Sequence, residues 1–354
     1  MKQSVKDYNR IVLKIGSSLL YSQNTKLDYA LIKQITACVS ALVKQGREVV
    51  VVSSGAIATG MSILGLQSRP KSLAYLQAAA AIGQHELMDI YRRSFKDNGL
   101  NCAQLLLTWE DFDDRKRYLN AKNTIQTLLK LGSIPIINEN DTVSTDEIKF
   151  GDNDRLSALV SSLICADILI ILSDIDGLLD KNKNVIPVVQ DISPQIKSLA
   201  CPTNKKACVG GMVTKIEAAK IAVGSGIACV IANGRKKDII SKVVKEPQAN
   251  GTLFIPKKGL KAREHWIAFG TKPKGNIIVD DGAKQALINK KSLLSVGIAA
   301  CEGNFETGDI VSLRDKSNDE FARGKISLGN KELDKIKGKR YHKEIIHRDN
   351  IVIL

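Results

Sequence analysis

The sequence predicts an α/β protein, in which a mainly parallel open sheet is sandwiched by helices and a small β-rich domain follows. Two observations predict this class. Residues 10–235 alternate short apolar runs with longer segments of helical periodicity, which is the pattern of repeated strand–helix–strand units. Beyond residue 272, short apolar runs follow one another between Gly, Asn and Asp turns, which is typical of a compact β domain.

The first part of the chain shows the clearest alternation. Ile11–Ile15 is an apolar run that ends at a Gly-Ser turn, and we expect it to be a strand. Ala30–Gln45 carries apolar residues at helical spacing, which predicts a helix. Val49–Val52 is a β-branched run without polar alternation, as expected of a strand covered on both faces. Ser72–Phe95 is an alanine-rich stretch that predicts a long helix ending before an Asn-Gly pair.

The alternation continues through the middle of the chain. Cys102–Thr108 and Ile134–Asn138 have the composition of buried strands, and Leu156–Cys165 has the spacing of an amphipathic helix. The remaining elements are the strands Ile168–Leu172 and Ala228–Ile231 and the helix Met212–Val223. Because helical segments separate the strands, we expect a mainly parallel sheet with helices on both faces.

The composition changes near residue 235. Residues 235–263 are rich in lysine, and we expect the last sheet elements and a connection there. Beyond them the sequence predicts the helix Gly282–Lys290 and the strands Ile277–Val279, Ile310–Leu313, Phe321–Ile326 and Ile351–Leu354. The predicted domains are therefore 1–258 and 273–354, joined by a linker at 259–272.

Composition and charge exclude several classes of protein. Of the 354 residues, 44% are apolar and 25% are charged, which excludes a disordered chain. The start of the chain has no apolar signal segment, and the most apolar stretch, Ala158–Leu172, is too short to span a bilayer. We therefore expect a cytoplasmic protein without membrane association. The net charge of +15 suits either a nucleic acid or an anionic small substrate.

Several known motifs of nucleotide and metal sites are absent from the sequence. There is no GxxxxGK phosphate loop followed by Ser or Thr, and no GxGxxG follows a predicted strand. No His or Cys pair has the spacing of metal ligands, and we assign no metal ligand. The segment His347-Arg348-Asp349-Asn350 matches the catalytic loop of protein kinases. No other kinase motif accompanies it, and we interpret the match as chance.

Small and polar residues follow the central predicted strands, where open α/β sheets bind ligands. Small residues let backbone N–H groups approach an anion, and lysines add positive charge. A lysine in the first turn of the predicted helix at 212 is unfavourable there unless an anion binds beside it. The segments are Lys14-Ile15-Gly16-Ser17-Ser18, Ser53-Ser54-Gly55-Ala56, Asn138-Glu139-Asn140-Asp141, Ser173-Asp174 and Gly210-Gly211-Met212-Val213-Thr214-Lys215. Together they predict an anion site at one edge of the sheet.

These segments, in this order, also carry a resemblance. With Lys149-Phe-Gly-Asp-Asn-Asp154 they resemble the motifs of the amino acid kinase family over residues 10–255. From about residue 273 the chain is similar to the PUA domain that many such enzymes carry. The resemblance implies transfer of the γ-phosphoryl group of ATP, bound with Mg²⁺, to the side-chain carboxylate of L-glutamate. The product would be glutamyl 5-phosphate, in the first step of proline biosynthesis.

The resemblance also implies roles for individual residues. The catalytic residues would be Lys14, Lys215 and Asp154, because the two lysines would flank the migrating group and the carboxylate would hold them. The glutamate-binding residues would be Ser54, Gly55, Ala56, Asp141 and Asn153, with Asp141 receiving the ammonium group. The ATP-binding residues would be Lys14, Ser173, Asp174, Val209, Gly210, Gly211, Met212, Val213, Thr214 and Lys215.

Two alternatives to this function stay open at the level of sequence. Another member of the family would phosphorylate acetylglutamate, aspartate, carbamate or a nucleoside monophosphate, and the fold does not separate these. A PUA-like domain and a basic chain also fit RNA binding. However, residues 271–354 hold 16 basic and 12 acidic residues, a net charge of only +4, and few aromatic side chains for base stacking.

The resemblance further implies partners and regulation. We expect a homo-oligomer, either a dimer or a tetramer, and a glutamyl-phosphate reductase would receive the labile product. Feedback inhibition by proline is expected at a site that overlaps the glutamate site, with residues 142–150 as its flap.

Overall fold

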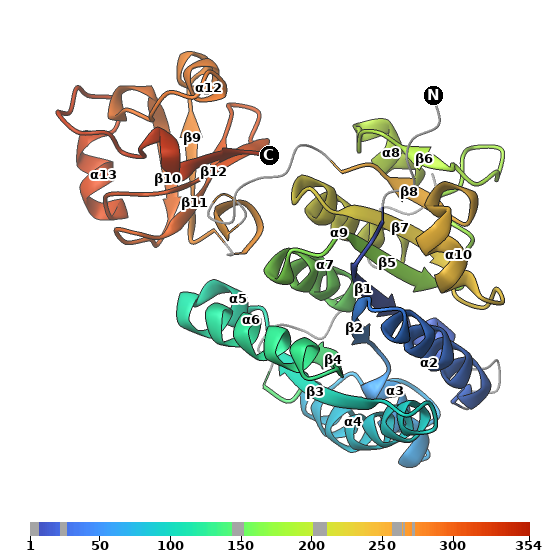
Figure 1. The fold of residues 1–354 in the computed structure, drawn as a ribbon. Coiled ribbons are helices and arrows are strands. Elements are labelled where there is room, and N and C mark those ends of the chain that lie inside the picture. The colour runs from blue at the N-terminus through green and yellow to red at the C-terminus, as the bar shows by residue number, and fades with distance from the viewer. Residues whose placement is uncertain are drawn as a thin grey trace. The chain divides into compact units, whose positions relative to one another are not determined.

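The computed structural model (Figure 1) describes residues 7–21, 27–143, 152–200, 211–256, 264, 266–270 and 273–354. The chain divides into two units, Met1–Gly259 and Leu260–Leu354. The predicted domain boundary at 258 stays a prediction, and the predicted linker lies partly outside the described residues. Within that linker, Trp266–Gly270 forms a π-helical turn, η2, whose Ile267 packs with Ile310 and Val352 of the second unit.

The described part of the first unit is built on one mainly parallel sheet of eight strands. They are β1 (Arg10–Ile15), β2 (Glu48–Ser53), β3 (Asn101–Leu107), β4 (Ser133–Glu139), β5 (Ile168–Ser173), β6 (Val188–Val189), β7 (Ala228–Asn233) and β8 (Thr252–Phe254). Their order is β3-β4-β2-β1-β5-β7-β8-β6, and every neighbouring pair is parallel except β7 and β8. Because β2 and β5 flank β1, the connections diverge at the carboxyl end of β1. The predicted fold class is confirmed.

Helices cover both faces of this sheet (Figure 1). They are α1 (Ser17–Leu20), α2 (Tyr29–Lys44), α3 (Ala56–Ile63), α4 (Leu73–Lys96), α5 (Glu110–Asp113), α6 (Arg115–Lys130), α7 (Asp152–Ile164), α8 (Pro194–Leu199), α9 (Met212–Gly224) and α10 (Ile239–Lys245). Ile11, Leu13 and Ile15 of β1 join a buried cluster with α2, α4 and α10. Because strand side chains alternate, Val12 and Lys14 point to the opposite face, where α7 and α9 pack.

The short elements α1, α5, α8 and β6 were not predicted, and three longer elements of the first unit also differ from the sequence prediction. The helix predicted as amphipathic at Leu156–Cys165 is α7, which begins at Asp152 and is buried nearly all round, because it lies among the sheet, α6 and α9. Strand β3 was expected to be buried, but it is an edge strand that pairs only with β4 and is mostly part-exposed. Helix α6 was not predicted, although Tyr118, Ile125 and Leu129 recur at helical spacing; of its residues only Ile125 is buried.

Helices α3 and α4 approach each other closely through two glycines. A Cβ atom on Gly60 would lie 1.8 Å from the carbonyl oxygen of Ala79, and one on Gly83 would lie 1.9 Å from that of Ala56. Both distances are far below van der Waals contact, so neither position accepts a side chain without movement of the backbone. Since α3 begins at Ala56, this contact also sets where the first turn of α3 lies.

We expect Gly83→Ala to lower the free energy of unfolding by about 1–3 kcal/mol, the usual cost of overpacking a close contact. The added methyl group must push α3 away, because the atom it meets is a backbone oxygen. Thermal denaturation measures the effect. The control is Ala81→Leu, on the exposed side of the same helix, and equal melting temperatures for the two variants would contradict the interpretation.

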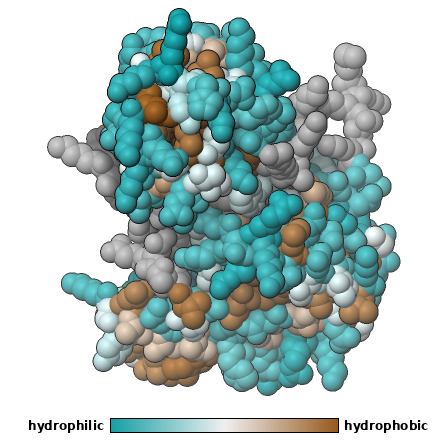
Figure 2. Space-filling view, turned by 90° about the vertical axis from the view of Figure 1, so that its left-hand side faces the viewer, coloured by the Kyte–Doolittle hydropathy of each residue, from teal (hydrophilic) through white to brown (hydrophobic). Residues whose placement is uncertain are grey.

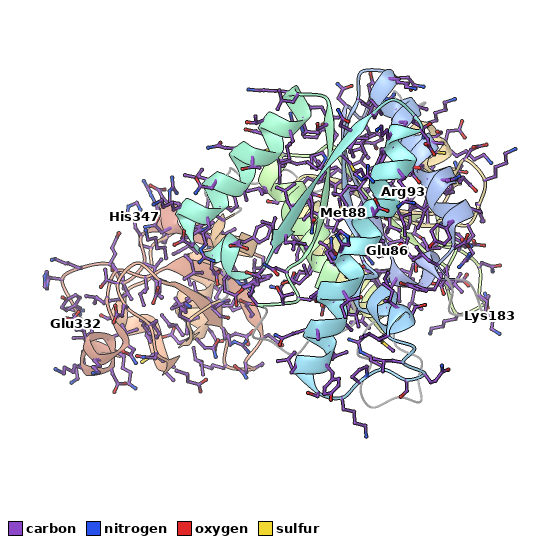
Figure 3. The ribbon with its side chains drawn as sticks, turned by 90° about the horizontal axis from the view of Figure 1, so that it is seen from below. Glu86, Met88, Arg93, Lys183, Glu332 and His347 are labelled. Carbon is purple, nitrogen blue, oxygen red and sulfur yellow. The ribbon has the colours of Figure 1, made fainter. Side chains whose placement is uncertain are left out.

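The outer surface of α3 and of the first turns of α4 is apolar. Its exposed side chains are Ile63, Leu64, Leu73, Tyr75 and Ile82. Brown side chains gather at the lower part of the face in Figure 2, where these helices lie. Farther along α4 the surface is charged, and Arg93, labelled in Figure 3, lies 2.6 Å from Asp89. Among the residues that the structure describes, no helix has the length and apolar character needed to cross a membrane.

The second unit is a small strand-rich domain. Its described strands are β9 (Gly275–Val279), β10 (Ile298–Gly303), β11 (Ile310–Arg314), β12 (Glu320–Lys325) and β13 (Ile351–Ile353), in the order β10-β9-β11-β12-β13. The α-helices whose bounds lie in the described part of this unit are α12 (Asp281–Ile288) and α13 (Asn330–Ile336). The four predicted strands and the predicted helix are found close to their expected positions. Strand β10 and helix α13 were missed; β10 has only a short apolar run, Ile298–Cys301, of which Ile298 alone is buried.

Candidate active site

A cavity of about 540 Å³ opens at the carboxyl edge of the sheet in the first unit. Its walls come from the segments that follow β1, β2, β4 and β5 and from the first turns of α7 and α9. The predicted site residues that line it are Lys14, Ser54, Gly55, Ala56, Asp141, Asn153, Asp154, Ser173, Asp174, Gly211, Met212, Thr214 and Lys215. The fold therefore brings together segments that are far apart in the sequence.

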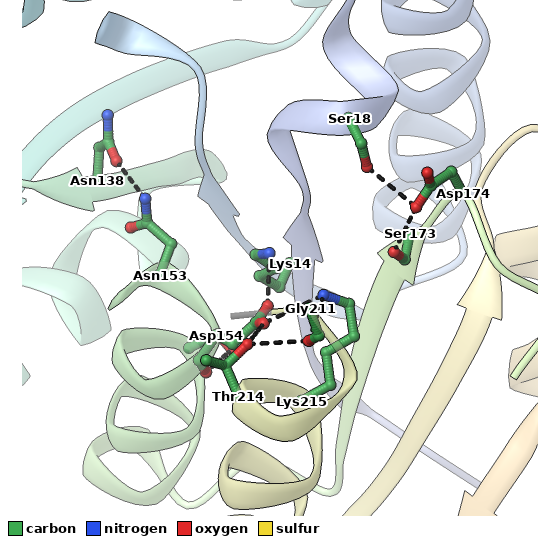
Figure 4. A network of polar contacts seen from close by, with 11 residues as sticks. Lys14, Ser18, Asn138, Asn153, Asp154, Ser173, Asp174, Gly211, Thr214 and Lys215 are labelled. Carbon is green, nitrogen blue, oxygen red and sulfur yellow. Dashed lines mark hydrogen bonds and ion pairs between the residues drawn. The ribbon is translucent and has the colours of Figure 1, made fainter. Parts of the chain in front are cut away.

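Inside this cavity, Asp154 joins two lysines (Figure 4). The Nζ atom of Lys14 lies 2.5 Å from Oδ1 of Asp154, and the Nζ atom of Lys215 lies 3.3 Å from Oδ2. The hydroxyl of Thr214 also donates to Oδ2, at 2.8 Å. Lys215 donates in addition to the carbonyl oxygen of Gly211, at 3.2 Å. One carboxylate from α7 therefore holds ammonium groups from β1 and α9.

Burial makes the charges of these three residues strongly interdependent. Asp154 is 1% exposed, Lys14 4% and Lys215 8%. Burial alone raises the pKa of Asp154, but the charges of Lys14 and Lys215 outweigh it and hold that pKa below its usual value. Burial lowers the pKa of Lys14; Asp154 opposes this shift, and the ammonium of Lys215 adds to it. Two cations and one anion leave a net positive charge, which favours an anionic ligand.

The local sequence explains how these side chains reach one another. Asp154 stands in the first turn of α7, where the helix dipole favours a carboxylate. Lys215 stands in the first turn of α9, where the dipole disfavours a cation, and the contact with Asp154 offsets this. The chain enters α9 through Gly211, whose φ of 68° is a conformation that favours glycine.

A second network forms one wall of the cavity beside β5. Asp174 accepts hydrogen bonds at Oδ1 from the hydroxyls of Ser173, at 3.0 Å, and Ser18, at 3.2 Å (Figure 4). Burial raises the pKa of Asp174, but these hydroxyls and a backbone hydrogen bond outweigh it and lower the pKa. The bonds join the end of β5 to the turn after β1.

A third network lies at the end of β4. Asn153 donates to Oδ1 of Asn138 at 3.0 Å, and the backbone N–H of Glu139 donates to the same oxygen at 2.9 Å. Asn138 in turn donates to Oε1 of Gln84 on α4, at 2.7 Å. Because Asn138 is buried with its amide engaged, it fixes the orientation of Asn153, which lines the cavity.

The turn between β2 and α3 depends on glycine. Gly55 has a φ of 109°, and a Cβ atom there would lie 2.8 Å from the side chain of Leu20. The hydroxyl of Tyr21 lies 2.5 Å from that of Thr59 and donates to the carbonyl oxygen of Gly55 at 3.2 Å. Burial raises the pKa of Tyr21 to about 12, so this hydroxyl keeps its proton at neutral pH. These contacts hold the backbone of Ser54–Ala56 against the cavity.

Sequence reasoning and the observed cavity differ at several residues. Val213 does not line the cavity, and Val209 and Gly210 lie outside the described residues. Sequence reasoning missed Arg69, which reaches the cavity from the connection between α3 and α4. No signal marked this arginine, because it follows no strand. Also missed were the apolar lining residues Leu178, Leu179 and Leu199.

The acidic residues of the cavity are dispersed. They are Glu139, Asp141, Asp154 and Asp174. Among the described residues, no group of three or more His, Cys, Asp or Glu side chains could hold a metal ion. His347, from the chance match to a protein-kinase loop, lies in the second unit (Figure 3), whereas the cavity is in the first.

Fold and site together define an α/β protein with an anion-binding cavity, in which paired ammonium groups lie at the point where the strand order diverges. Comparison with protein families agrees with this class. The amino acid kinase family model matches residues 9–233, and the PUA domain model matches residues 275–348. The chain therefore belongs to the amino acid kinase family and carries a PUA domain.

Relatives match along essentially the whole chain. It is 46% identical to the glutamate 5-kinase of Caldanaerobacter subterraneus subsp. tengcongensis and 45% identical to that of Thermoanaerobacter pseudethanolicus, in each case over 98% of both chains. It is 44% identical to the glutamate 5-kinase of Geobacter sp. (strain M21) over the full length of both. The resemblance inferred from the sequence motifs is confirmed.

Proposed function

We propose that this protein is a glutamate 5-kinase, which transfers the γ-phosphoryl group of ATP to the side-chain carboxylate of L-glutamate and forms glutamyl 5-phosphate for proline biosynthesis. The observation that carries the proposal is the pair of ammonium groups held on Asp154 inside the cavity. The volume of about 540 Å³ is within the usual range for small-molecule sites. The names of its full-length relatives support the same substrate.

The proposed reaction is an in-line displacement at phosphorus. A carboxylate oxygen of glutamate attacks the γ-phosphorus, and the bond from that phosphorus to the bridging oxygen of ADP breaks. Lys14 and Lys215 stabilise the negative charge on the transferred group, and Asp154 keeps both ammonium groups in place. The acceptor carboxylate is already ionised at neutral pH, so the reaction needs no general base.

The acceptor side of the cavity suits an amino acid with two carboxylates. Asp141 supplies a negative charge for the ammonium group, and Arg69 supplies a guanidinium that can bind the α-carboxylate through two hydrogen bonds. Asn153, oriented by Asn138, adds an amide to the same region. These groups leave the side-chain carboxylate directed toward the two lysines.

We assign the opposite side of the cavity to ATP. Its polar wall is formed by Ser173 and Asp174 beside β5 and by the first turn of α9, and Leu178 and Leu179 add apolar surface for the base. Mg²⁺ enters as the complex with ATP, because hard cations of this kind are held largely by phosphate oxygens and water. When bound, it would neutralise charge on the phosphates.

A substrate panel tests the proposal. Purified protein is assayed for ADP release with MgATP and, in turn, L-glutamate, N-acetylglutamate, aspartate, carbamate and a nucleoside monophosphate. We expect turnover with L-glutamate and far less with the other acceptors. Preference for N-acetylglutamate or a nucleotide would replace the proposal with another reaction of the same family.

We expect Asp141→Asn to raise the KM for L-glutamate by about tenfold to a hundredfold, with a smaller change in the KM for MgATP. The reason is that the substitution removes the charge that pairs with the substrate ammonium, and such bonds contribute about 1.5–3 kcal/mol. Initial-rate kinetics with each substrate varied measure both constants. Asp191→Asn, at a position that does not line the cavity, is the control, and an unchanged KM for glutamate in Asp141→Asn would refute the role.

Other expectations from the sequence stay predictions. The proposed homo-oligomer has support from the exposed apolar surface of α3 and α4. Transfer of product to a reductase and RNA binding by the PUA domain have no further support in the fold. Of the expected proline flap, residues 144–150 lie outside the described part of the chain.

A further inference from the structure

We propose that Arg235 is a positioning residue for the ATP side of the cavity, which it does not itself line. It holds the α1 turn, which we define as residues 17–21, against the end of β5. This inference rests on the proposed function only in assigning that side of the cavity to ATP.

The side chain of Arg235 makes three hydrogen bonds to the α1 turn and to the start of α2. Its Nη2 atom donates to the carbonyl oxygens of Ser18, at 3.1 Å, and Tyr21, at 3.0 Å. Its Nη1 atom donates to Oδ2 of Asp28, the N-cap residue of α2, at 3.1 Å. Carbonyls at the end of a helix lack intrahelical partners, and the planar guanidinium satisfies two of them at once.

The backbone around Arg235 is anchored on β5. The N–H of Gly234 donates to the carbonyl oxygen of Ser173 at 2.8 Å, and the N–H of Arg235 donates to Oδ1 of Asn233 at 3.0 Å. Asn233 donates to Oδ1 of Asp176 at 2.9 Å. Because β5 lies between β1 and β7, Arg235 spans from the turn after β7 across the end of β5 to the turn after β1.

A close approach supports the same arrangement. A Cβ atom on Gly234 would lie 2.4 Å from Cδ1 of Leu19, so the turn after β7 packs directly on α1. Helix α1 has only four residues and cannot be stable by itself. Its position must therefore come from the groups around it, among which Arg235 provides three directed bonds.

The α1 turn connects this contact to the cavity. Ser17 and Ser18 line the cavity, and Ser18 donates to Asp174 on the wall assigned to ATP. Arg235 is absent from the lining, so its effect must pass through the α1 turn. Loss of its three bonds should loosen this wall most. The acceptor side should change much less, because Tyr21 keeps its own contacts with Gly55 and Thr59, and Asp141 and Asn153 stand in other elements.

Kinetics of Arg235→Ala test the inference. We expect the KM for MgATP to rise about tenfold, while the KM for L-glutamate stays within about twofold of the wild-type value; tenfold corresponds to about 1.4 kcal/mol. Arg235→Lys should show a smaller rise in the KM for MgATP than Arg235→Ala. An ammonium group keeps the positive charge but lacks the planar set of N–H donors of a guanidinium. An unchanged KM for MgATP, or equal increases in both KM values, would overturn the inference.

A matched control separates positioning from general stability. Arg47 also donates to a backbone carbonyl, that of Tyr8 at 2.5 Å, and pairs with Asp7 at 3.1 Å, but it precedes β2 at the amino edge of the sheet. Arg47→Ala should leave both KM values unchanged. If Arg47→Ala raised the KM for MgATP as much as Arg235→Ala does, the effect would be one of stability and the inference would fail.

Direct binding distinguishes failure of this inference from failure of the proposed function. Calorimetry with a non-hydrolysable ATP analogue measures binding without any acceptor. Weaker binding in Arg235→Ala would support the inference even if the wild-type protein did not phosphorylate glutamate. Wild-type turnover of glutamate together with unchanged binding of the analogue in Arg235→Ala would refute the inference and leave the proposed function intact.

Discussion

Lys215→Ala is expected to lower kcat by about a hundredfold to a thousandfold, which is the usual effect of removing one preorganised donor from a charged transition state. Lys14→Ala should have a comparable effect. Each variant removes one of the two ammonium groups that Asp154 holds, so the transferred phosphoryl group loses stabilisation in the transition state. Coupled measurement of ADP release gives kcat, and circular dichroism establishes that the variants are folded.

The fold should tolerate either lysine substitution, because Asp154 retains the other lysine as a partner. Lys44→Ala, at an exposed position in the last turn of α2, is the control and should keep wild-type turnover. Lys215→Arg keeps the charge but changes its geometry, and we expect an intermediate rate. Wild-type kcat in both alanine variants would refute the catalytic assignment.

Asp154→Asn is expected to lower the free energy of unfolding by about 3–5 kcal/mol, because it leaves two buried ammonium groups without their counter-charge. The side chain is 1% exposed, so solvent cannot replace the lost carboxylate. We expect kcat to fall as well, since the ammonium groups lose their fixed positions. Thermal and chemical denaturation measure the loss. Asp89→Asn, which also removes the partner of two cations but at the surface of α4, should change stability little.

The pH dependence of stability gives a second measurement on the same variant. In the wild-type protein the pKa of Asp154 is depressed, so its contribution to stability is present above the unfolded value and is lost as pH falls through the folded value. Asparagine has no such titration. The pKa of Lys14 is already lowered with Asp154 present and should fall further without it. At pH values below the ordinary lysine pKa, the unfolded variant then binds more protons than the folded variant. The free energy of unfolding of the variant should therefore increase as pH rises.

Melting temperatures at neutral pH and at about pH 9.5 test this sign. Between neutral pH and this higher pH, the melting temperature of Asp154→Asn should rise more, or fall less, than that of the wild-type protein. An identical pH dependence in the two proteins would show that Asp154 does not balance the charges of Lys14 and Lys215.

Much of the fold could be predicted because its signals are local. The β-branched run of β2 and the helical spacing of α2 are visible within a few neighbouring residues. Prediction failed where burial depended on remote neighbours. Strand β3 has a buried-type composition but lies at the sheet edge, and α7 is enclosed by elements on several sides.

The candidate site was partly predictable for a different reason. Open α/β sheets bind ligands at strand ends, so a residue such as Asp174 could be assigned from its place directly after a strand. Arg69 follows no strand, and Arg235 stands in the turn after β7 but does not line the cavity. Both stand in connections, and their positions relative to the cavity depend on how α3 packs on α4 and how β7 lies beside β5.

The sequence alone was enough to identify the family, the order of the longer strands and helices along most of the chain, and the lysines and carboxylates near their ends. The resemblance implied that Asp154 would hold both lysines, and the folded chain provides the contacts themselves, which lie buried in one cavity. The physical reason is that spacing along the chain sets which face of a strand or helix a side chain occupies. Which faces meet is decided by the order of strands in the sheet and by the packing of α7 and α9 on it.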